Sequence, residues 1–218
     1  MEEINERFVN RKEAWAQAKR GLTEEGVPPD TRKKMPRLPP GQRMTKGWPV
    51  LDLGVHPTIP LNEWTLTIGG AVAHSVVWTW QDFLAQPQIR PVSDFHCVTS
   101  WSTFDNQWEG VSFRQLLSAV QPLSSARFVL FSSSDGYTTN LSLDACDDDD
   151  VLLASKWNGA PLTTEHGGPV RVIVPKRYAW KGAKWVKAIT FAERDQPGFW
   201  EVRGYSNSAR PWDEDRYG

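Results

Sequence analysis

The chain has 218 residues, of which 39% are apolar and 11% aromatic, enough to build the core of one large domain or two small ones. Its 25 basic and 26 acidic residues leave a net charge of -1, which excludes a global attraction to nucleic acid or to an anionic membrane. Any basic site must therefore be local. Twelve tryptophans are many for this length, and we expect some of them to line a cavity or an interface.

Export and disulfide signals are weak in this sequence. The N-terminus has no apolar signal region, and no later stretch approaches 18 uncharged apolar residues. Cys97 and Cys146 lie far apart along the chain, and their spacing does not indicate a disulfide-stapled secreted fold. The sequence therefore predicts a cytoplasmic protein with reduced thiols.

Residues 1–42 are predicted to form an N-terminal arm and a linker. Ile4, Phe8 and Trp15 stand at helical spacing among charged residues, and Gly21 is placed to end the helix. The prolines at positions 28, 29, 36, 39 and 40 prevent regular hydrogen-bond ladders and indicate an extended linker. We expect the compact domain to span residues 43–218.

Within residues 43–218, short strands alternate with a few short helices. Hydrophobic alternation and β-branched residues predict strands at 64–68, 75–78, 93–99, 127–132, 137–143, 170–174 and 185–191. Helices are predicted at 80–86 and 113–120, with Thr79 and Ser112 as N-caps. Turn signals stand at Gly69-Gly70, Ser134-Asp135-Gly136 and Asn158-Gly159. The pattern indicates an α+β domain of mostly antiparallel strands.

Cys97 is the first candidate for chemistry, because polar residues surround it in the segment D-F-H-C-V-T-S-W-S-T-F-D-N. A thiolate acts as a ligand or nucleophile only where its pKa is lowered or a metal displaces the proton. A nucleophilic pair with His166 or His56 stays open, since such pairs meet in space rather than in sequence. A buried structural thiol is the alternative.

A basic segment follows in residues 166–192, which contain no acid. It carries six basic residues: Arg171, Lys176, Arg177, Lys181, Lys184 and Lys187. Glycines at 167, 168 and 182 let backbone amides approach an anion closely, although the spacing is not that of a P-loop. The segment therefore predicts a phosphate or pyrophosphate ligand. An edge strand protected by lysines is the alternative.

Several separated motifs resemble one family. They are F-H-C-V-T-S-W-S, W-E-G-V, H-G-G-P-V-R-V-I-V-P, K-G-A-K-W-V and the terminal G-F-W-E-x-x-G-Y-S-N-S-x-x-P-W-x-E-x-R-Y. Over roughly residues 40–218 they resemble the molybdopterin-binding oxidoreductases that include sulfite oxidase, and above all the short bacterial group that consists of the catalytic domain alone. The resemblance implies a mixed, mostly antiparallel β-rich sulfite-oxidase-type fold with short helices.

The same resemblance implies a molybdenum-molybdopterin cofactor and a two-electron transfer of an oxygen atom. Cys97 matches the cysteine that supplies the protein's thiolate to the metal, a soft ligand suited to a metal already bound by sulfur. The cofactor contacts fall on His166, Arg171, Gly182, Ala183 and Lys184, together with Ser133 at the end of its strand. Three residues near Cys97 are candidates for lining the substrate pocket: His96, Trp101 and Asp105.

The substrate is expected to be a small sulfur- or oxygen-bearing molecule. Sulfite oxidase carries an arginine pair just after the cysteine, whereas Ser100 and Ser102 stand there in this chain. A reductase acting on a sulfoxide therefore fits as well as an oxidase. With no second redox centre visible, we expect a separate electron-transfer partner.

Two other classes of function compete with the molybdenum enzyme. One is a non-catalytic binding module for a phosphorylated ligand that uses the basic segment alone. The other is a cysteine-dependent thiol enzyme that uses Cys97 as its nucleophile.

Overall fold

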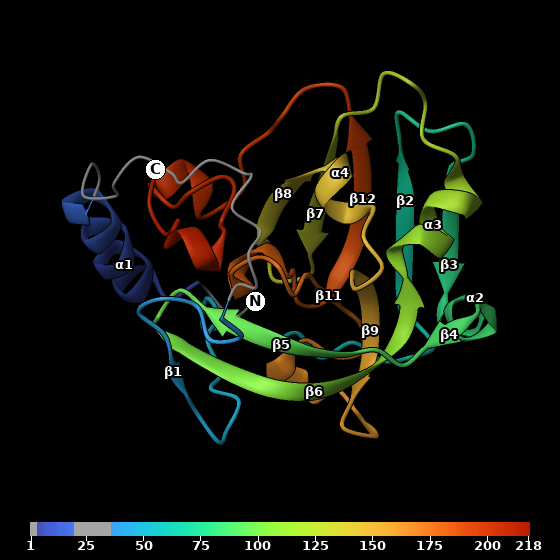
Figure 1. The fold of residues 1–218 in the computed structure, drawn as a ribbon. Coiled ribbons are helices and arrows are strands. Elements are labelled where there is room, and N and C mark those ends of the chain that lie inside the picture. The colour runs from blue at the N-terminus through green and yellow to red at the C-terminus, as the bar shows by residue number, and fades with distance from the viewer. Residues whose placement is uncertain (1–3, 20–35) are drawn as a thin grey trace.

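A computed structural model describes residues 4–19 and 36–218, and two β-sheets form its body. The seven-stranded sheet contains β1 (Arg43–Met44), β4 (Gln88–Ile89), β5 (Val92–Cys97), β6 (Trp101–Ser112), β9 (Leu152–Trp157), β10 (Ala160–Pro161) and β11 (Arg171–Ile173). In the five-stranded sheet the order is β3 (Val76–Thr79), β2 (Thr65–Gly70), β12 (Val186–Ala192), β7 (Phe128–Ser133) and β8 (Thr138–Ser142). Figure 1 shows β5 and β6 running across the bottom, with the short β1 at the lower left and the five-stranded sheet standing above β5 and β6.

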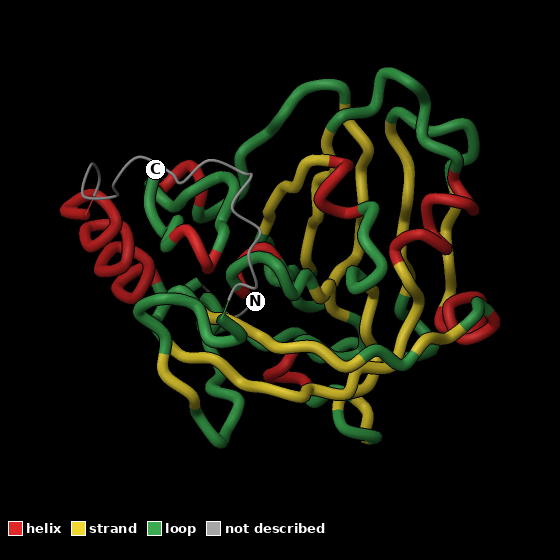
Figure 2. The backbone as a smooth tube through the Cα atoms, in the orientation of Figure 1, coloured by secondary structure: helices red, strands yellow, loops and turns green. Residues whose placement is uncertain are grey.

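Most neighbouring strands pair antiparallel. Among the described residues, the parallel pairs are β1 with β6 and β2 with β12. The helices are α1 (Glu6–Lys19), α2 (Trp80–Ala85), α3 (Phe113–Val120) and α4 (Leu143–Cys146), with 3-10 turns at η1 (Thr164–His166), η2 (Ala179–Lys181), η3 (Glu201–Arg203) and η4 (Pro211–Asp213). Figure 2 shows how little helix there is beside the strands. The predicted α+β, mostly antiparallel fold is confirmed.

Local sequence signals placed α2 and α3 correctly, whereas the one-turn helix α4 was not predicted. The Thr79 side chain accepts a hydrogen bond from the Asp82 backbone amide while Asp82 bonds back to the Thr79 amide, a full capping box at the start of α2. Ser112 caps α3 by accepting from the Gln115 amide. Ser134-Asp135-Gly136 joins β7 to β8 as predicted, and Asn158-Gly159 turns the chain from β9 into β10.

Gly69-Gly70 was predicted to signal a hairpin, and β2 and β3 do pair antiparallel; the turn lies further along the chain than predicted, because both glycines are inside β2. Gly70 pairs with Phe191 of β12 at a φ of +91°, and a Cβ there would lie 2.2 Å from the Phe191 carbonyl oxygen. The glycines therefore serve close strand pairing, and the connection to β3 follows them.

Five of the strands in the described residues were not predicted: the two-residue strands β1, β4 and β10, and the longer β6 and β9. The sequence after Cys97 indicated a loop, yet β6 is the longest strand and pairs with β5, β9, β4 and β1. The polar residues of β6 obscured the strand pattern in the sequence, because many of them are hydrogen-bonded inside the protein rather than facing water. Thr103 and Asn106, for example, bond to each other. β9 was missed because most of its residues are buried on both faces, which removes the alternating pattern.

The arm helix α1 packs against the C-terminal segment and the loop at Leu53. Val9 and Ala16 are buried, and the Trp15 ring meets the edge of Tyr217 at 6.3 Å between centroids. Figure 1 shows α1 beside the red C-terminal segment. Gly21 and the prolines at 28 and 29 lie outside the described residues. None of the helices in the described part is both long and apolar enough to cross a membrane.

A buried ion pair attaches the C-terminal segment to the body. Lys181 Nζ lies 2.6 Å from Glu201 Oε1, with both side chains almost fully buried. Lys181 also donates to the Asn140 carbonyl at 3.0 Å, and Glu201 Oε1 accepts from Trp180 Nε1 at 3.1 Å and from the Thr139 hydroxyl at 2.9 Å. These contacts fix the loop between β11 and β12 against the final segment.

Removing one partner of this pair should destabilise the fold. We expect Lys181→Met or Glu201→Gln to lower the free energy of unfolding by about 3–5 kcal/mol, because each leaves a buried polar group without its partner. Urea unfolding followed by tryptophan fluorescence measures the change. Arg114→Met, which breaks the exposed ion pair with Asp147, is the control and should change little. Unfolding at unchanged urea concentration in both buried variants would contradict the expectation.

Candidate functional site

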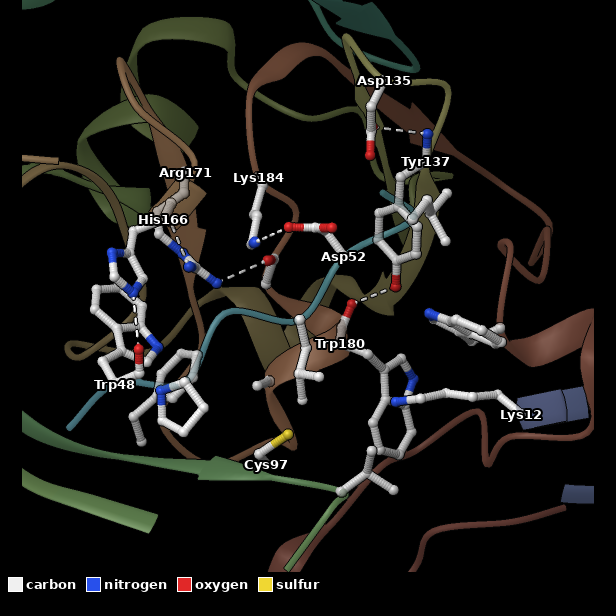
Figure 3. A pocket seen from close by; sticks show the side chains of 18 of the residues that line it. Lys12, Trp48, Asp52, Cys97, Asp135, Tyr137, His166, Arg171, Trp180 and Lys184 are labelled. Carbon is white, nitrogen blue, oxygen red and sulfur yellow. Dashed lines mark hydrogen bonds and ion pairs between the residues drawn. The ribbon is translucent and has the colours of Figure 1, made fainter. Parts of the chain in front are cut away.

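A cavity of about 820 Å³, including its open mouth, lies between β5, the β11–β12 loop and the C-terminal segment. Cys97 lies at one end of it in Figure 3, and the side chains of His166, Arg171 and Lys184 lie at the other. Aromatic walls are contributed by Trp48, Phe95, Trp101, Tyr137, Trp180, Trp185, Trp200 and Tyr205.

Cys97 reaches the cavity from the last position of β5. Phe95 lines the same cavity because residues two apart on a strand share a face. Cys97 is a free thiol, 5% exposed, and its Sγ lies 3.2 Å from the Thr99 hydroxyl. Burial raises the pKa of the Cys97 thiol, while Thr99 opposes that shift. A metal would therefore have to displace the proton to bind a thiolate here.

Arg171, on β11, is 3% exposed and has no carboxylate partner among the described residues. Its guanidinium donates to the carbonyls of His166 at 2.9 Å and Gly182 at 3.2 Å, and it lies over the Trp48 ring at 5.0 Å. Burial lowers its pKa to about 9, so the group stays charged at neutral pH. Its Nε has no hydrogen-bond partner. A buried cation with a spare donor is suited to an anionic ligand.

His166 stands beside Arg171 at the end of η1. Its ring stacks on Trp48 with centroids 4.2 Å apart and an interplanar angle of 22°. Nε2 lies 3.0 Å from the Trp48 carbonyl, which can only accept, so Nε2 carries the proton and Nδ1 accepts from the Thr163 hydroxyl at 3.0 Å. Burial and the nearby cations Arg171 and Lys184 lower its pKa. The imidazole is therefore neutral and fixed in orientation.

Lys184 adds a second cation to this end of the cavity. Its Nζ lies 3.2 Å from Asp52 Oδ2 and donates to the Glu165 carbonyl at 2.6 Å. Burial and the neighbouring Arg171 charge lower its pKa to about 8. Gly167, at a φ of +96°, lets the lysine pass, because a Cβ there would lie 2.8 Å from Lys184 Cβ.

The loop residues Gly182, Ala183 and Lys184 do not all face the cavity. Gly182 and Lys184 line it, and a Cβ at Gly182 would lie 2.6 Å from the Val172 carbonyl oxygen. Ala183 is fully buried, and its carbonyl accepts from the Val172 amide at 2.8 Å, so it positions its neighbours. Ser133 does not line the cavity either, although its buried hydroxyl has no hydrogen-bond partner.

Of the three pocket candidates near Cys97, only Trp101 lines the cavity. His96 lies on the opposite face of β5, where Nδ1 is 2.8 Å from the Ser102 hydroxyl and burial lowers its pKa to about 4. Asp105 has an exposed side chain that forms an ion pair with Arg37. The expectation that His96 and Asp105 line the pocket is therefore not met.

Other lining residues escaped sequence reasoning. Trp48 and Asp52 come from a segment without a recognisable pattern, and Lys12 lies on the helix interpreted as a peripheral arm. Asp135 was noted only as part of a turn. Trp180 stands next to the glycines of the basic segment, which was the available signal. These residues meet only because the chain folds back on itself.

Comparisons with known proteins agree with this geometry. A family model described as "Oxidoreductase molybdopterin binding domain" matches residues 53–200. The "Uncharacterized oxidoreductase YuiH" of Bacillus subtilis is 39% identical, over 83% of this chain and 92% of that relative. A "Putative protein-methionine-sulfoxide reductase subunit YedZ1" of Azospira oryzae is 28% identical over 65% of this chain, which spans only 53% of it.

A solved structure shares the fold. The sulfane dehydrogenase SoxCD from Paracoccus pantotrophus matches 66% of this chain with a TM-score of 0.61 and 20% sequence identity. The match covers 42% of that chain. At this level of identity the comparison supports the architecture of the two sheets and nothing finer.

The raised pKa of Cys97 predicts its reactivity in the cofactor-free protein. We expect iodoacetamide to label the Cys146→Ser variant, in which Cys97 is the remaining thiol, with a pH profile shifted above that of free glutathione, because less thiolate is present at each pH. Mass spectrometry of pH-jump samples measures the rate. The urea-unfolded variant, as control, should follow glutathione. A profile shifted to lower pH would contradict this and would favour a nucleophilic thiol.

Proposed function

This chain belongs to the family of molybdopterin-binding oxidoreductases that includes sulfite oxidase, and on that premise we propose that it transfers an oxygen atom to or from a small sulfur- or oxygen-bearing substrate. Proteins of this family bind the molybdenum-molybdopterin cofactor, and the chain is an oxidoreductase. The observation that carries the proposal is one cavity with a lone buried thiol at one end and two cations, buried Arg171 and partly buried Lys184, at the other.

The residues present fit this cofactor. Among the described residues no group of three or more His, Cys, Asp or Glu side chains could hold a metal ion, so a metal at Cys97 takes its further ligands from a cofactor. The unpartnered Nε of Arg171 and the charge of Lys184 suit the cofactor's phosphate. We propose that Cys97 ligates molybdenum and that His166, Arg171, Gly182 and Lys184 bind the pterin and its phosphate.

When bound, the cofactor supplies two-electron redox chemistry with oxygen-atom transfer. The protein would position the cofactor and the substrate and exclude water from the site. The Thr99 hydroxyl, 3.2 Å from Sγ, can donate to the Cys97 thiolate and so adjust its donor strength. Aromatic walls at Trp101, Trp180 and Trp200 keep bulk water from the Cys97 end. Ala183 and Ser133 do not line the cavity, and we propose that they support the residues that do.

Metal and activity measurements test the role of Cys97. Protein made in a host that synthesises molybdopterin should contain close to one molybdenum per chain and show a thiolate-to-metal absorption band. Cys97→Ser should lose that band and lower dye-linked turnover of sulfite or a sulfoxide by more than about 100-fold, since even outer contacts of a metal site are worth about 10–100-fold. Cys146→Ser, which changes the other buried thiol, is the matched control.

The outcomes separate the three classes of function. Wild-type protein without molybdenum would overturn the proposal. Binding of a phosphorylated ligand that is equal in wild type and Cys97→Ser, without turnover, would favour a binding module. The thiol-enzyme hypothesis is weakened by the structure, because burial raises the pKa of Cys97 and no histidine among the described residues lies within hydrogen-bond distance of its Sγ.

The pKa of Lys184 predicts how cofactor uptake depends on pH. Since the pKa of Lys184 in the free cavity is about 8, raising the pH from 7 to 9 should remove its charge and lower the uptake of isolated cofactor by about tenfold. Molybdenum bound per chain is the readout. In Lys184→Arg the guanidinium stays charged, so most of that fall should disappear. A wild-type uptake independent of pH, or an unchanged fall in the arginine variant, would exclude Lys184 as the phosphate contact.

Electron exchange with a separate partner and a cytoplasmic location remain predictions from the sequence. The proposal covers both oxidation and reduction of the substrate. Assays with an artificial electron donor and with an artificial electron acceptor distinguish a reductase from an oxidase. At the Cys97 end of the cavity, the only cation among the described lining residues is Lys12 of α1. Its charge bears on which class of substrate can bind there.

A further inference from the structure

The Cys97 end of the cavity is closed by a helix that the family match does not include. Phe8 and Lys12 of α1 line the cavity, whereas the family model begins at residue 53. The two residues are four positions apart and so share one helix face. Figure 3 shows the Lys12 side chain extending from α1 toward Trp180, on the Cys97 side of the pocket. This chain therefore adds its own wall to the site.

α1 is held in place by several independent contacts. The Asn5 amide donates to the Leu53 carbonyl at 2.9 Å, and Val9 and Ala16 are buried on the same side as Lys12. Glu13 lies 3.9 Å from Arg203 of η3. Because these contacts fix the helix on both sides of Lys12, the position of the lysine is determined by packing rather than by its own charge.

Lys12 carries a charge without a counter-charge in the described part of the chain. Its Nζ lies 4.9 Å from the centroid of the Phe8 ring, and no described carboxylate is within ion-pair distance of it. Burial lowers the pKa of Lys12, so an anion bound beside it would stabilise its charged form. A half-buried, unpaired ammonium facing a cavity favours an anion.

No other described cation is free to take that role at this end. Arg216 also acts on Cys97 electrostatically, but it does not line the cavity, and its guanidinium already donates to the Val98 carbonyl and to the Ser100 hydroxyl at 3.1 Å. Arg171 and Lys184 lie at the opposite end, on the far side of Trp180 from Lys12 in Figure 3. The remaining wall near Lys12 is aromatic, from Trp180, Trp200 and Tyr205.

We propose that Lys12 binds the negatively charged group of the substrate beside Cys97, so that the substrate is a small oxyanion or a molecule bearing one anionic group. The inference rests on the proposed function, because it places the reacting end of the substrate at the metal ligand. Lys12 fixes the substrate's charge while the aromatic wall excludes water around it, where a single charge contributes more than it would in solvent. Specificity then resides in a helix outside the family-matched region.

Sulfate, a non-reacting oxyanion, is the probe. We would titrate molybdenum-loaded protein with sulfate and follow tryptophan fluorescence, which reports on Trp180 and Trp200 in the cavity wall. Loaded protein is used so that the cofactor already fills the Arg171 and Lys184 end. Lys12→Gln should raise the dissociation constant by about tenfold or more, and Lys12→Arg should restore most of the affinity. Lys187→Gln, an exposed lysine on β12, is the matched control and should bind as wild type.

Two further readouts keep the outcomes apart. Molybdenum content is measured in each sample, and it should be equal in wild type and Lys12→Gln. Absence of molybdenum from the wild type would overturn the proposed function. Equal molybdenum with equal sulfate affinity in wild type and Lys12→Gln, or no sulfate binding by loaded wild type, would overturn the Lys12 proposal alone. A lowered melting temperature in Lys12→Gln with unchanged sulfate affinity would assign Lys12 a structural role and overturn it too.

Discussion

The buried ion pair between Lys181 and Glu201 is the interaction on which the site depends. It joins the loop between β11 and β12 to the C-terminal segment, and Trp180 between them donates to the same carboxylate. Three walls of the cavity follow from this one anchor: the loop carrying Gly182 and Lys184, the Trp180 ring, and the segment carrying Trp200 and Tyr205. Desolvating two buried charges costs free energy, and here it is offset by their ion pair and by hydrogen bonds to four neighbouring polar groups, although Glu201 Oε2 has no partner.

The cavity separates two kinds of electrostatic task. At one end, buried Arg171 and partly buried Lys184 provide positive charge, which we propose binds the cofactor's phosphate, and His166 stays neutral because burial and these neighbouring cations lower its pKa. At the other end, burial raises the pKa of the Cys97 thiol although the Thr99 hydroxyl and the Lys12 charge oppose that shift, so a metal would have to take the proton's place. In the proposed function, this division holds the cofactor's phosphate at the end of the cavity opposite Cys97.

The arm helix illustrates how a catalytic domain acquires specificity without changing its core. The family-matched residues 53–200 include Cys97 and the cationic end, whereas Lys12 and Tyr205 lie on either side of that range. Segments at both ends of the chain thus meet over the Cys97 end of the cavity, and α1 packs against Tyr217 and Arg203 there. Under the proposed function, changes in such segments would alter which substrates reach the metal without changing the proposed cofactor contacts.

The sequence by itself determined the local structure and the chemical character of the site. Caps at Thr79 and Ser112 and the turn at Asp135 act through neighbouring atoms, and the motifs around Cys97 and Gly182 indicated a thiolate ligand and a phosphate site. Tertiary structure decided what depends on distant segments. β6 and β9 are strands because their residues are buried against neighbouring strands. His96 lies on the face of β5 opposite the cavity, and Lys181 of the basic segment pairs with Glu201 instead of facing a phosphate. Lys12 reached the cavity for the same reason, since only packing brings residue 12 beside residue 97.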